Sequence, residues 1–286
     1  MLNERGRLVM KIMDNIHLIR NEFHVTPEVK RYVNIYLLTG ENCYLIDSGV
    51  SGSAKIIEEY MHSIGRKLSD IKGIFLTHSH PDHIGGAAEI KSIAGVKVYA
   101  PKQELNWIEN IDMQYKERPI PNFYKLLSKS VVVDRPLSDG DVISLEVGLQ
   151  IRAVGTPGHS HGSMSFVLND TVIFTGDAIP VTYDLPIFVD YEQSVQSLDR
   201  ISELSNIQYI CPAWDEVYDK EKLPEVIHNS KDMLKRLRSA TVRVEKECSQ
   251  ASENEKLLKI LGQVGMLQYI GNPLVERSIY ACKKVL

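Results

Sequence analysis

Four residues that can bind a metal ion lie within six positions of one another. Residues 77–86 read Thr-His-Ser-His-Pro-Asp-His-Ile-Gly-Gly, an H-x-H-x-D-H pattern made by His78, His80, Asp82 and His83. Imidazole nitrogen and carboxylate oxygen are the ligands that zinc and similar divalent metals prefer. A polar loop in which histidines merely gather is the alternative. Because the whole chain has only nine histidines, so dense a cluster favours a metal site.

The apolar pattern places this histidine string directly after a buried strand. The strand is expected at Ile71–Leu76, and a helix at Ile84–Ala94 follows the string. In α/β folds, ligands gather beyond the carboxyl ends of strands, where loops can carry polar groups. His78 and His80 are two apart in an extended segment and therefore share a face, and His83 is expected to reach the same space from the start of the helix.

Strands and helices alternate along the chain in two similar halves. In the first half we expect further strands at Val33–Leu38, Asn42–Ile46 and Val96–Ala100, and a helix at Ser53–Ile64. In the second half we expect strands at Val131–Val133, Val142–Leu145, Leu149–Val154, Met164–Leu168, Thr171–Thr175 and Ile207–Cys211, and a helix at Tyr191–Leu204. From about Leu223 the pattern is mostly helical, over Val226–Glu247 and Asn254–Leu267. This rhythm predicts an α/β (α+β) chain whose two halves pack face to face.

More polar side chains follow later strands. Pro157-Gly158-His159-Ser160-His161 comes after one strand, Gly176-Asp177 after a second, and Pro212-Ala213-Trp214-Asp215 after a third. Each segment alone is weak, because Gly-His and Gly-Asp are common in turns. In this order after H-x-H-x-D-H, they indicate that ligands from several loops converge on one site.

The bulk composition is that of an ordinary globular protein. Hydrophobic residues make up 43% and charged residues 24%, and the formal charge of −4 includes no basic run that would suggest a nucleic-acid partner. The four cysteines are far apart, which predicts reduced thiols rather than a disulfide framework. Charges near the N-terminus and the lack of a long apolar window argue against secretion and membrane insertion, so a cytoplasmic protein is expected.

Taken in order, these segments resemble the metallo-β-lactamase superfamily. The resemblance rests on Asp47-Ser48-Gly49, the histidine string, Pro-Gly-His159 and Gly176-Asp177. It implies a four-layer αββα sandwich of two mixed β-sheets flanked by helices, over residues 1–222. Residues 223–286 would form a helical C-terminal extension, packed on this domain or at a dimer interface.

The resemblance also implies a centre with two divalent metal ions, zinc first, with iron or manganese as alternatives. His78, His80 and His159 would bind the first ion, Asp82 and His83 the second, and Asp177 both. Two such ions about 3.5–4 Å apart share a water and lower its pKa from 15.7 toward ~7, so that a bridging hydroxide can attack a carbonyl or phosphoryl centre. Asp82 would also orient this hydroxide.

One position departs from the family pattern, which usually has a last histidine after the final strand. Trp214 stands in its place, and an indole N–H is a donor that cannot bind a metal. Either Asp215 supplies the ligand by a shift of one residue, or the second site lacks a protein ligand and holds its metal weakly. As a third alternative, Asp215 caps a helix or accepts a hydrogen bond near the site.

Two further residues are candidates for protonating the leaving group. They are His161, whose alternative is a surface loop position, and Tyr183, whose alternative is a packing role. The segment Lys102–Lys129 is rich in aromatic residues and lacks a strand pattern. It forms either one wall of an apolar substrate pocket or a helical excursion that packs on the body of the protein.

The expected function is a metal-dependent hydrolase acting on an ester, lactone, thioester or amide of a small molecule. No nucleic-acid or membrane partner is expected, and a homodimer is one role for the C-terminal helices. The alternatives are an iron-containing redox enzyme on the same fold and a catalytically weak ligand-binding or sensor protein. His80 favours the hydrolase, because the oxygen-reducing di-iron relatives carry an acidic residue at this position.

Overall fold

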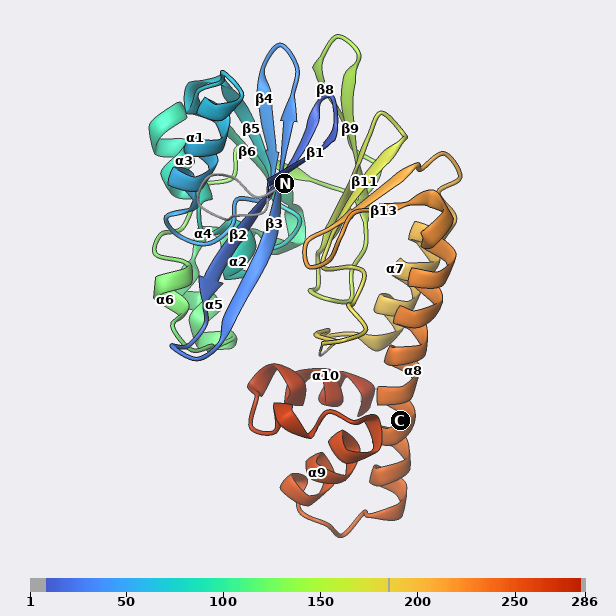
Figure 1. The fold of residues 1–286 in the computed structure, drawn as a ribbon. Helices are drawn as coiled ribbons and strands as arrows, with labels where there is room; N and C mark the ends of the chain where they lie inside the picture. The colour runs from blue at the N-terminus through green and yellow to red at the C-terminus, as the bar shows by residue number, and fades with distance from the viewer. Residues whose placement is uncertain (1–8, 185, 284–286) are drawn as a thin grey trace.

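Two mixed β-sheets pack face to face in residues 9–184 and 186–283, the parts of the chain that the computed structural model describes (Figure 1). The first sheet has the order β1-β2-β3-β4-β5-β6-β7 and consists of β1 (Val9–Met13), β2 (Ile16–His24), β3 (Lys30–Thr39), β4 (Cys43–Ile46), β5 (Ile71–Phe75), β6 (Lys97–Pro101) and β7 (Arg135–Leu137). Its first four strands are antiparallel, and β4 to β7 are parallel. The sequence argument against secretion concerns the N-terminus, of which residues 1–8 lie outside the described part of the chain.

The second sheet has the order β13-β12-β11-β10-β9-β8. Its strands are β8 (Val142–Glu146), β9 (Leu149–Gly155), β10 (Met164–Leu168), β11 (Val172–Gly176), β12 (Tyr209–Pro212) and β13 (Tyr218–Asp219). Only the β11–β12 pair is parallel among these described strands. In each sheet, the parallel strands end at the edge where the predicted metal ligands follow.

Strand alternation divides the apolar residues between two layers of core. In β3, Ile35 and Leu37 face the helices outside the sheet, whereas Tyr36 and Leu38 face the other sheet. The core between the sheets is rich in aromatic rings, and the Phe75 ring lies edge-on to the Phe166 ring at 5.5 Å. Burial of these side chains on both faces is what holds the two sheets together.

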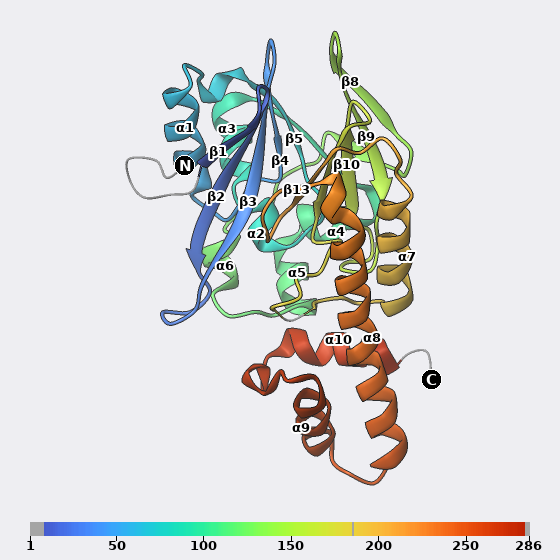
Figure 2. The ribbon, with the colours of Figure 1, turned by 45° about the vertical axis from the view of Figure 1, so that its right-hand side comes forward.

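Helices cover the outer faces of both sheets (Figures 1 and 2). The helices α1 (Ser53–Ser63) and α3 (Ala87–Ala94) cover the first sheet, and α7 (Tyr191–Ser202) and α8 (Leu223–Glu247) cover the second. The predicted four-layer αββα sandwich is therefore confirmed. Short 3₁₀ helices lie at Leu68–Asp70, Lys102–Glu104, Lys220–Lys222 and Leu267–Tyr269.

The C-terminal helices extend beyond one end of the sandwich. The helix α8 packs on α7 with its first half and continues past it, and α9 (Glu253–Val264) and α10 (Pro273–Lys283) pack against its second half (Figure 2). Helix α8 begins at Leu223, where the C-terminal extension was expected to begin. Whether residues 223–286 form a separate domain or a dimer interface stays a prediction. None of the described helices has the length and apolar character needed to cross a bilayer.

The contact between the sheet ends is made by backbone and polar side chains. The N–H of Met164, at the start of β10, donates to the carbonyl of Thr77, which follows β5, at 2.9 Å. On the other side, the Asn34 side chain of β3 donates to the carbonyl of Asp215 at 2.8 Å, and the Tyr36 hydroxyl donates to the carbonyl of Pro212 at 2.7 Å. These bonds tie loops of one sheet to strands of the other.

Two sequence predictions are wrong in detail. The helix expected at Ile84–Ala94 is two helices, α2 (Pro81–Ile84) and α3, separated by a Gly-Gly pair that approaches other backbone. The strand expected at Val131–Val133 is not formed. The N–H of Val131 donates to the carbonyl of Ile108 in α4 (Leu105–Glu109), and the N–H of Val133 donates to the carboxylate of Glu109. This backbone is therefore bonded to a helix rather than to the sheet.

The aromatic segment Lys102–Lys129 is helical, as one of the two alternatives predicts. It contains α4 (Leu105–Glu109), α5 (Ile111–Glu117) and α6 (Phe123–Leu126). Phe123 is buried in the core outside the first sheet, whereas Tyr115 and Tyr124 are exposed. Among these three aromatic residues, Phe123 is therefore the one that packs the segment onto the core outside the first sheet.

Replacing Gly85 by alanine tests the close approach at the α2–α3 break. Gly85 has helical angles that suit alanine, but an added Cβ would lie 2.3 Å from the Leu126 carbonyl oxygen and 2.5 Å from the Ser51 nitrogen. We expect Gly85→Ala to lower the free energy of unfolding by about 1–3 kcal/mol in chemical denaturation. Gly262→Ala is the control, because this position in α9 is open and alanine should raise that free energy slightly. Equal stability of both variants would contradict the steric argument.

Candidate metal centre

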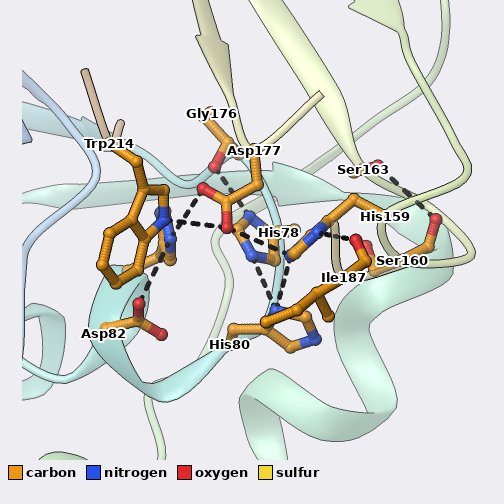
Figure 3. Close-up of polar contacts among 12 residues, drawn as sticks. His78, His80, Asp82, His159, Ser160, Ser163, Gly176, Asp177, Ile187 and Trp214 are labelled. Atoms are coloured by element: carbon orange, nitrogen blue, oxygen red, sulfur yellow. Dashed lines mark hydrogen bonds and ion pairs between the residues drawn. The ribbon is translucent and has the colours of Figure 1, made fainter. Parts of the chain in front are cut away.

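Loops at the carboxyl ends of five strands meet at one edge of the sandwich (Figure 3). The histidine string follows β5, and Asp47 follows β4 beside it. From the second sheet come the loops after β9, β11 and β12, which carry His159, Asp177 and Trp214. Asp177 lies between Trp214 on one side and His159 and His78 on the other (Figure 3). The predicted ligands are thus brought together from both sheets.

Three imidazole nitrogens converge in the first group of ligands. His80 Nδ1 lies 3.0 Å from His78 Nε2 and 2.8 Å from His159 Nε2, and all three rings are buried. A tetrahedral zinc ion with Zn–N distances of about 2.0–2.1 Å separates its nitrogen ligands by about 3.3 Å. The observed spacing and the all-nitrogen donor set fit a single divalent ion.

Hydrogen bonds at the opposite ring nitrogens orient two of these histidines. His159 Nδ1 donates to the carbonyl of Ile187 at 2.7 Å, and His78 Nδ1 lies 3.0 Å from the Thr77 hydroxyl. A proton on Nδ1 leaves the Nε2 lone pair free for a metal, so these bonds select the tautomer that a ligand needs.

Burial keeps these histidines neutral. It lowers the pKa of His78 and His80 well below the usual range, and the nearby charges of His83 and Arg118 lower them further. Burial also lowers the pKa of His159, more than Asp177 raises it. At neutral pH all three rings can offer a lone pair without first losing a proton.

A second group consists of His78, His83 and Asp177. His83 Nε2 and Asp177 Oδ1 lie 3.1 Å apart, yet both atoms are buried without a hydrogen-bond partner in the described part of the chain. Asp177 Oδ2 lies 3.2 Å from His159 Nε2, so the carboxylate reaches toward both groups. Asp82 Oδ2 lies 3.7 Å from His83 Nε2. Two buried atoms that lack a partner and can each offer a lone pair, an imidazole nitrogen and a carboxylate oxygen, fit a cation between them.

Burial would lower the pKa of His83, but Asp177, Asp47 and Asp82 together raise it well above its usual range. Burial would also raise the pKa of Asp177, but His83 and His159 lower it below its usual range. In the protein without metal, a proton on His83 therefore provides the positive charge that these carboxylates require.

The structure does not bring the predicted ligand Asp215 into either group. Its Oδ1 accepts from the N–H of Glu216 at 2.8 Å and its Oδ2 from the Tyr218 hydroxyl at 2.5 Å. Trp214 approaches the centre instead, and its Nε1 donates to Asp177 Oδ2 at 3.0 Å. Asp215 thus has the third role considered for it, that of a hydrogen-bond acceptor near the site.

The two candidate proton donors also lie away from the ligands. His161 is exposed and lines a cavity of about 680 Å³ with residues of α9 and α10. The Tyr183 hydroxyl donates to the Trp214 carbonyl at 3.1 Å, and burial raises the pKa of Tyr183 above its usual range. A raised pKa makes Tyr183 a weaker acid, and its side chain, which is 65% exposed, is not packed in the core either.

Sequence reasoning missed Glu104, which joins the two ligand loops. Its buried carboxylate accepts from the N–H and hydroxyl of Ser79, between His78 and His80. It also accepts from the Ser160 hydroxyl at 2.8 Å and the Gly162 N–H at 2.6 Å, beyond His159. No periodic pattern marks Glu104, because its partners lie 25 to 58 positions away.

Asp47 has the corresponding function for the second group. It accepts from the N–H and hydroxyl of Thr77 at 2.8 and 2.9 Å and from His83 Nδ1 at 2.7 Å. Its backbone has a φ of 58°, in the left-handed region that aspartate tolerates better than most residues. The carboxylate orients His83 so that Nε2 points to Asp177.

A family model described as the metallo-beta-lactamase superfamily matches residues 29–206, which include all the ligands described above except the segment of Trp214. The chain belongs to the metallo-β-lactamase superfamily. The resemblance inferred from the ordered motifs is therefore confirmed, and the superfamily supports a metal-dependent hydrolase at the level of the family.

Individual relatives within the superfamily are distant. A probable metallo-hydrolase of Methanocaldococcus jannaschii is 30% identical over 195 residues, which are 65% of this chain and 89% of that protein. An atrochrysone carboxyl ACP thioesterase of Aspergillus fumigatus is 35% identical over 174 residues, 60% of this chain and 47% of that protein. The structure of a metallo-beta-lactamase family protein from Thermus thermophilus superposes with a TM-score of 0.72 at 18% identity, covering 96% of this chain and 95% of that one, which shows a shared fold.

Replacing Glu104 by glutamine tests its positioning role. Glutamine keeps the size but turns one acceptor oxygen into an N–H₂ donor that faces other donors. We expect Glu104→Gln to weaken zinc binding by about 10–100-fold in a competitive chelator titration. Glu109→Gln is the control, because Glu109 accepts from Val133 and touches neither ligand loop. Unchanged zinc affinity in Glu104→Gln would contradict this role.

Replacing Trp214 by histidine tests the second ligand group. Histidine would restore a metal-binding nitrogen where the superfamily usually has one and remove the bond from Trp214 to Asp177. We expect the second equivalent of zinc to bind about tenfold more tightly, or better, in calorimetric titration. Trp214→Phe is the control, since it removes the same bond without adding a ligand. If both variants gain equally, the added nitrogen is not responsible.

Proposed function

We propose that this protein hydrolyses a thioester, ester, lactone or amide of a small molecule at a divalent metal held by His78, His80 and His159. The observation that carries the proposal is the convergence of three buried, neutral imidazoles: His80 Nδ1 lies within 3.0 Å of both His78 Nε2 and His159 Nε2. A divalent ion bound there acidifies a water nucleophile and polarises the carbonyl under attack. The side chains around the ion would accept the proton of the water and orient the substrate.

Asp82 is the residue proposed to accept the proton of the attacking water. Its side chain lies at the start of α2 and is partly exposed, beside His83 and open to a substrate. Burial raises the pKa of Asp82, and the neighbouring Asp177 raises it as well, although His83 opposes them. A raised pKa makes the carboxylate a stronger base, as a general base requires.

We favour zinc as the resident metal, because three histidines suit it. A second ion would use His83, Asp177 and Asp82. In the structure Trp214 occupies one lone pair of Asp177, and no histidine replaces the missing ligand among the described residues. We therefore propose one tightly held zinc and a weaker second site. Iron or manganese remains an alternative metal, and a redox or ligand-binding role is the alternative function.

A thioester is the favoured substrate class. The Aspergillus relative is named as a thioesterase, and the proposal for this chain rests on that similarity together with the complete first ligand group. A β-lactam is less favoured, because the second ligand group is incomplete. The cytoplasmic location remains part of the proposal, supported by four free cysteines. A homodimer stays a prediction.

Hydrolysis of a panel of small thioesters, esters and lactones tests the proposal. We expect zinc-loaded protein to be active, and His159→Ala to lose tightly bound zinc and at least about 100-fold in kcat/KM. Asp82→Asn should keep the first zinc and lose about 10²–10⁴-fold in kcat.

His161→Ala is the matched control, two residues along the same loop but exposed and outside both ligand groups. It should keep zinc content and turnover within about twofold, since surface substitutions have small effects. Zinc-loaded wild-type protein that hydrolyses none of the panel would contradict the proposed function, as would a His159→Ala variant with unchanged metal content and activity.

A further inference from the structure

Helix α5 carries Arg118 to the metal-ligand loop. The N–H of Arg118 donates to the Gln114 carbonyl at 2.7 Å and closes the last turn of the helix. In the same turn, the fully buried Gln114 side chain donates to the carbonyl of Ser79 at 2.6 Å. Ser79 lies between the ligands His78 and His80. The end of α5 is therefore fixed against the metal centre.

The Arg118 side chain is buried without a partner. It is only 6% exposed, and within the described part of the chain its guanidinium forms no hydrogen bond or ion pair. Buried arginines are normally paired, because an uncompensated buried charge is strongly destabilising. Even more exposed arginines here are paired, such as Arg152 with Asp170 and Arg200 with Asp139. The described residues thus supply no partner for Arg118, and because its nitrogens are not among the fully buried unpaired atoms, they are open to a group from outside.

The bonds of Gln114 to Arg118 and to Ser79 hold Arg118 near the ligand groups, and the nearby charges act on its pKa. Burial lowers the pKa of Arg118 to about 10, against the opposing effect of Asp82 and Asp177. The guanidinium thus remains charged at neutral pH. The positive charge of Arg118 also acts on His80: burial lowers the pKa of His80 most, and Arg118 lowers it further. None of these carboxylates is close enough to form an ion pair with it.

A second cation lies at the same place. Arg277 of α10 donates to the carbonyl of Glu117, the residue before Arg118. Its charge lowers the pKa of Arg118, and Arg277 also forms no ion pair with a described residue. A metal ion held by three neutral histidines would add further positive charge nearby. The positive charges of Arg118, Arg277 and the metal ion would together favour binding of an anion at this position.

We propose that Arg118 binds an oxyanion group of the substrate, a carboxylate or a phosphate, and that the substrate is therefore an anionic ester or thioester. The planar fork of a guanidinium matches the two oxygens of such a group and binds it bidentately. Arg277 contributes charge at the same position. The reaction assigned to this substrate rests on the proposed hydrolase function, whereas binding of the anion can be measured without turnover.

Calorimetric binding to zinc-loaded protein tests the anion site directly. The probes are glutarate, inorganic phosphate and the neutral analogue glutaramide. We expect Arg118→Gln to weaken binding of glutarate or phosphate by about 10–100-fold and to leave glutaramide unaffected. Arg152→Gln, which loses a surface pair with Asp170, is the matched control and should bind as wild type. A preference for glutarate identifies a carboxylate site, and a preference for phosphate identifies a phosphate site.

The melting temperature separates this role from a structural one. Because the guanidinium has no partner among the described residues, Arg118→Gln should keep or raise the melting temperature. Since a carboxylate also binds zinc, variants are compared at equal zinc content. Unchanged affinity of Arg118→Gln for both anions overturns the proposal, and so does a fall of several degrees without any change in affinity.

A pair of matched substrates links the anion site to turnover. The pair is the glutaryl and valeryl thioesters of N-acetylcysteamine, which differ in the terminal carboxylate. Arg118→Gln should lower kcat/KM about 10–100-fold for the glutaryl thioester and leave the valeryl thioester within about twofold. If neither is hydrolysed while Arg118→Gln abolishes anion binding, the proposed function fails and the anion site stands. If Arg118→Gln hydrolyses both like wild type, the anion site fails and the proposed function stands.

Discussion

The contact between the ends of the two sheets is the constraint on which the metal centre depends. His80 and His159 come from different sheets and are 79 positions apart, yet their ligand nitrogens lie 2.8 Å apart. The bond from Met164 to Thr77 crosses between the sheets within one residue of His78, and Glu104 bonds both loops. Because buried imidazoles must be held without help from water, this network sets the geometry before a metal arrives.

The ligands were predictable from the sequence because their signals are local. The histidine string, His159 and Asp177 each follow an apolar strand, and ordered strands bring such loops to one edge. Glu104 was not predictable because its partners lie 25 to 58 positions away, and Arg118 was not because its side chain has no partner among the described residues. The sandwich followed from the family resemblance that the motifs carry, whereas the strand order and the elements β1, β2, β7, β13 and α10 were not predicted.

The segment after β12 shows how one residue changes the character of a site. The sequence shows that Trp214 cannot bind a metal, but it left open whether a neighbouring residue replaces the missing histidine ligand. In the structure Asp215 is held by Glu216 and Tyr218, and the indole bonds to the carboxylate that a second ion would need. The chain therefore keeps a complete all-histidine group beside an incomplete mixed one, which sets it apart from a symmetric two-metal centre.

Helix α10 touches both sides of the metal centre. Arg277 bonds to the end of α5, next to Arg118, and the Ser278 hydroxyl accepts from the N–H of Phe188, next to the Ile187 carbonyl that holds His159. Substitutions in this peripheral helix can thus alter substrate choice while every ligand stays intact. The outermost helix therefore reaches the surroundings of the centre through two backbone contacts, and its described residues contribute no ligand of their own.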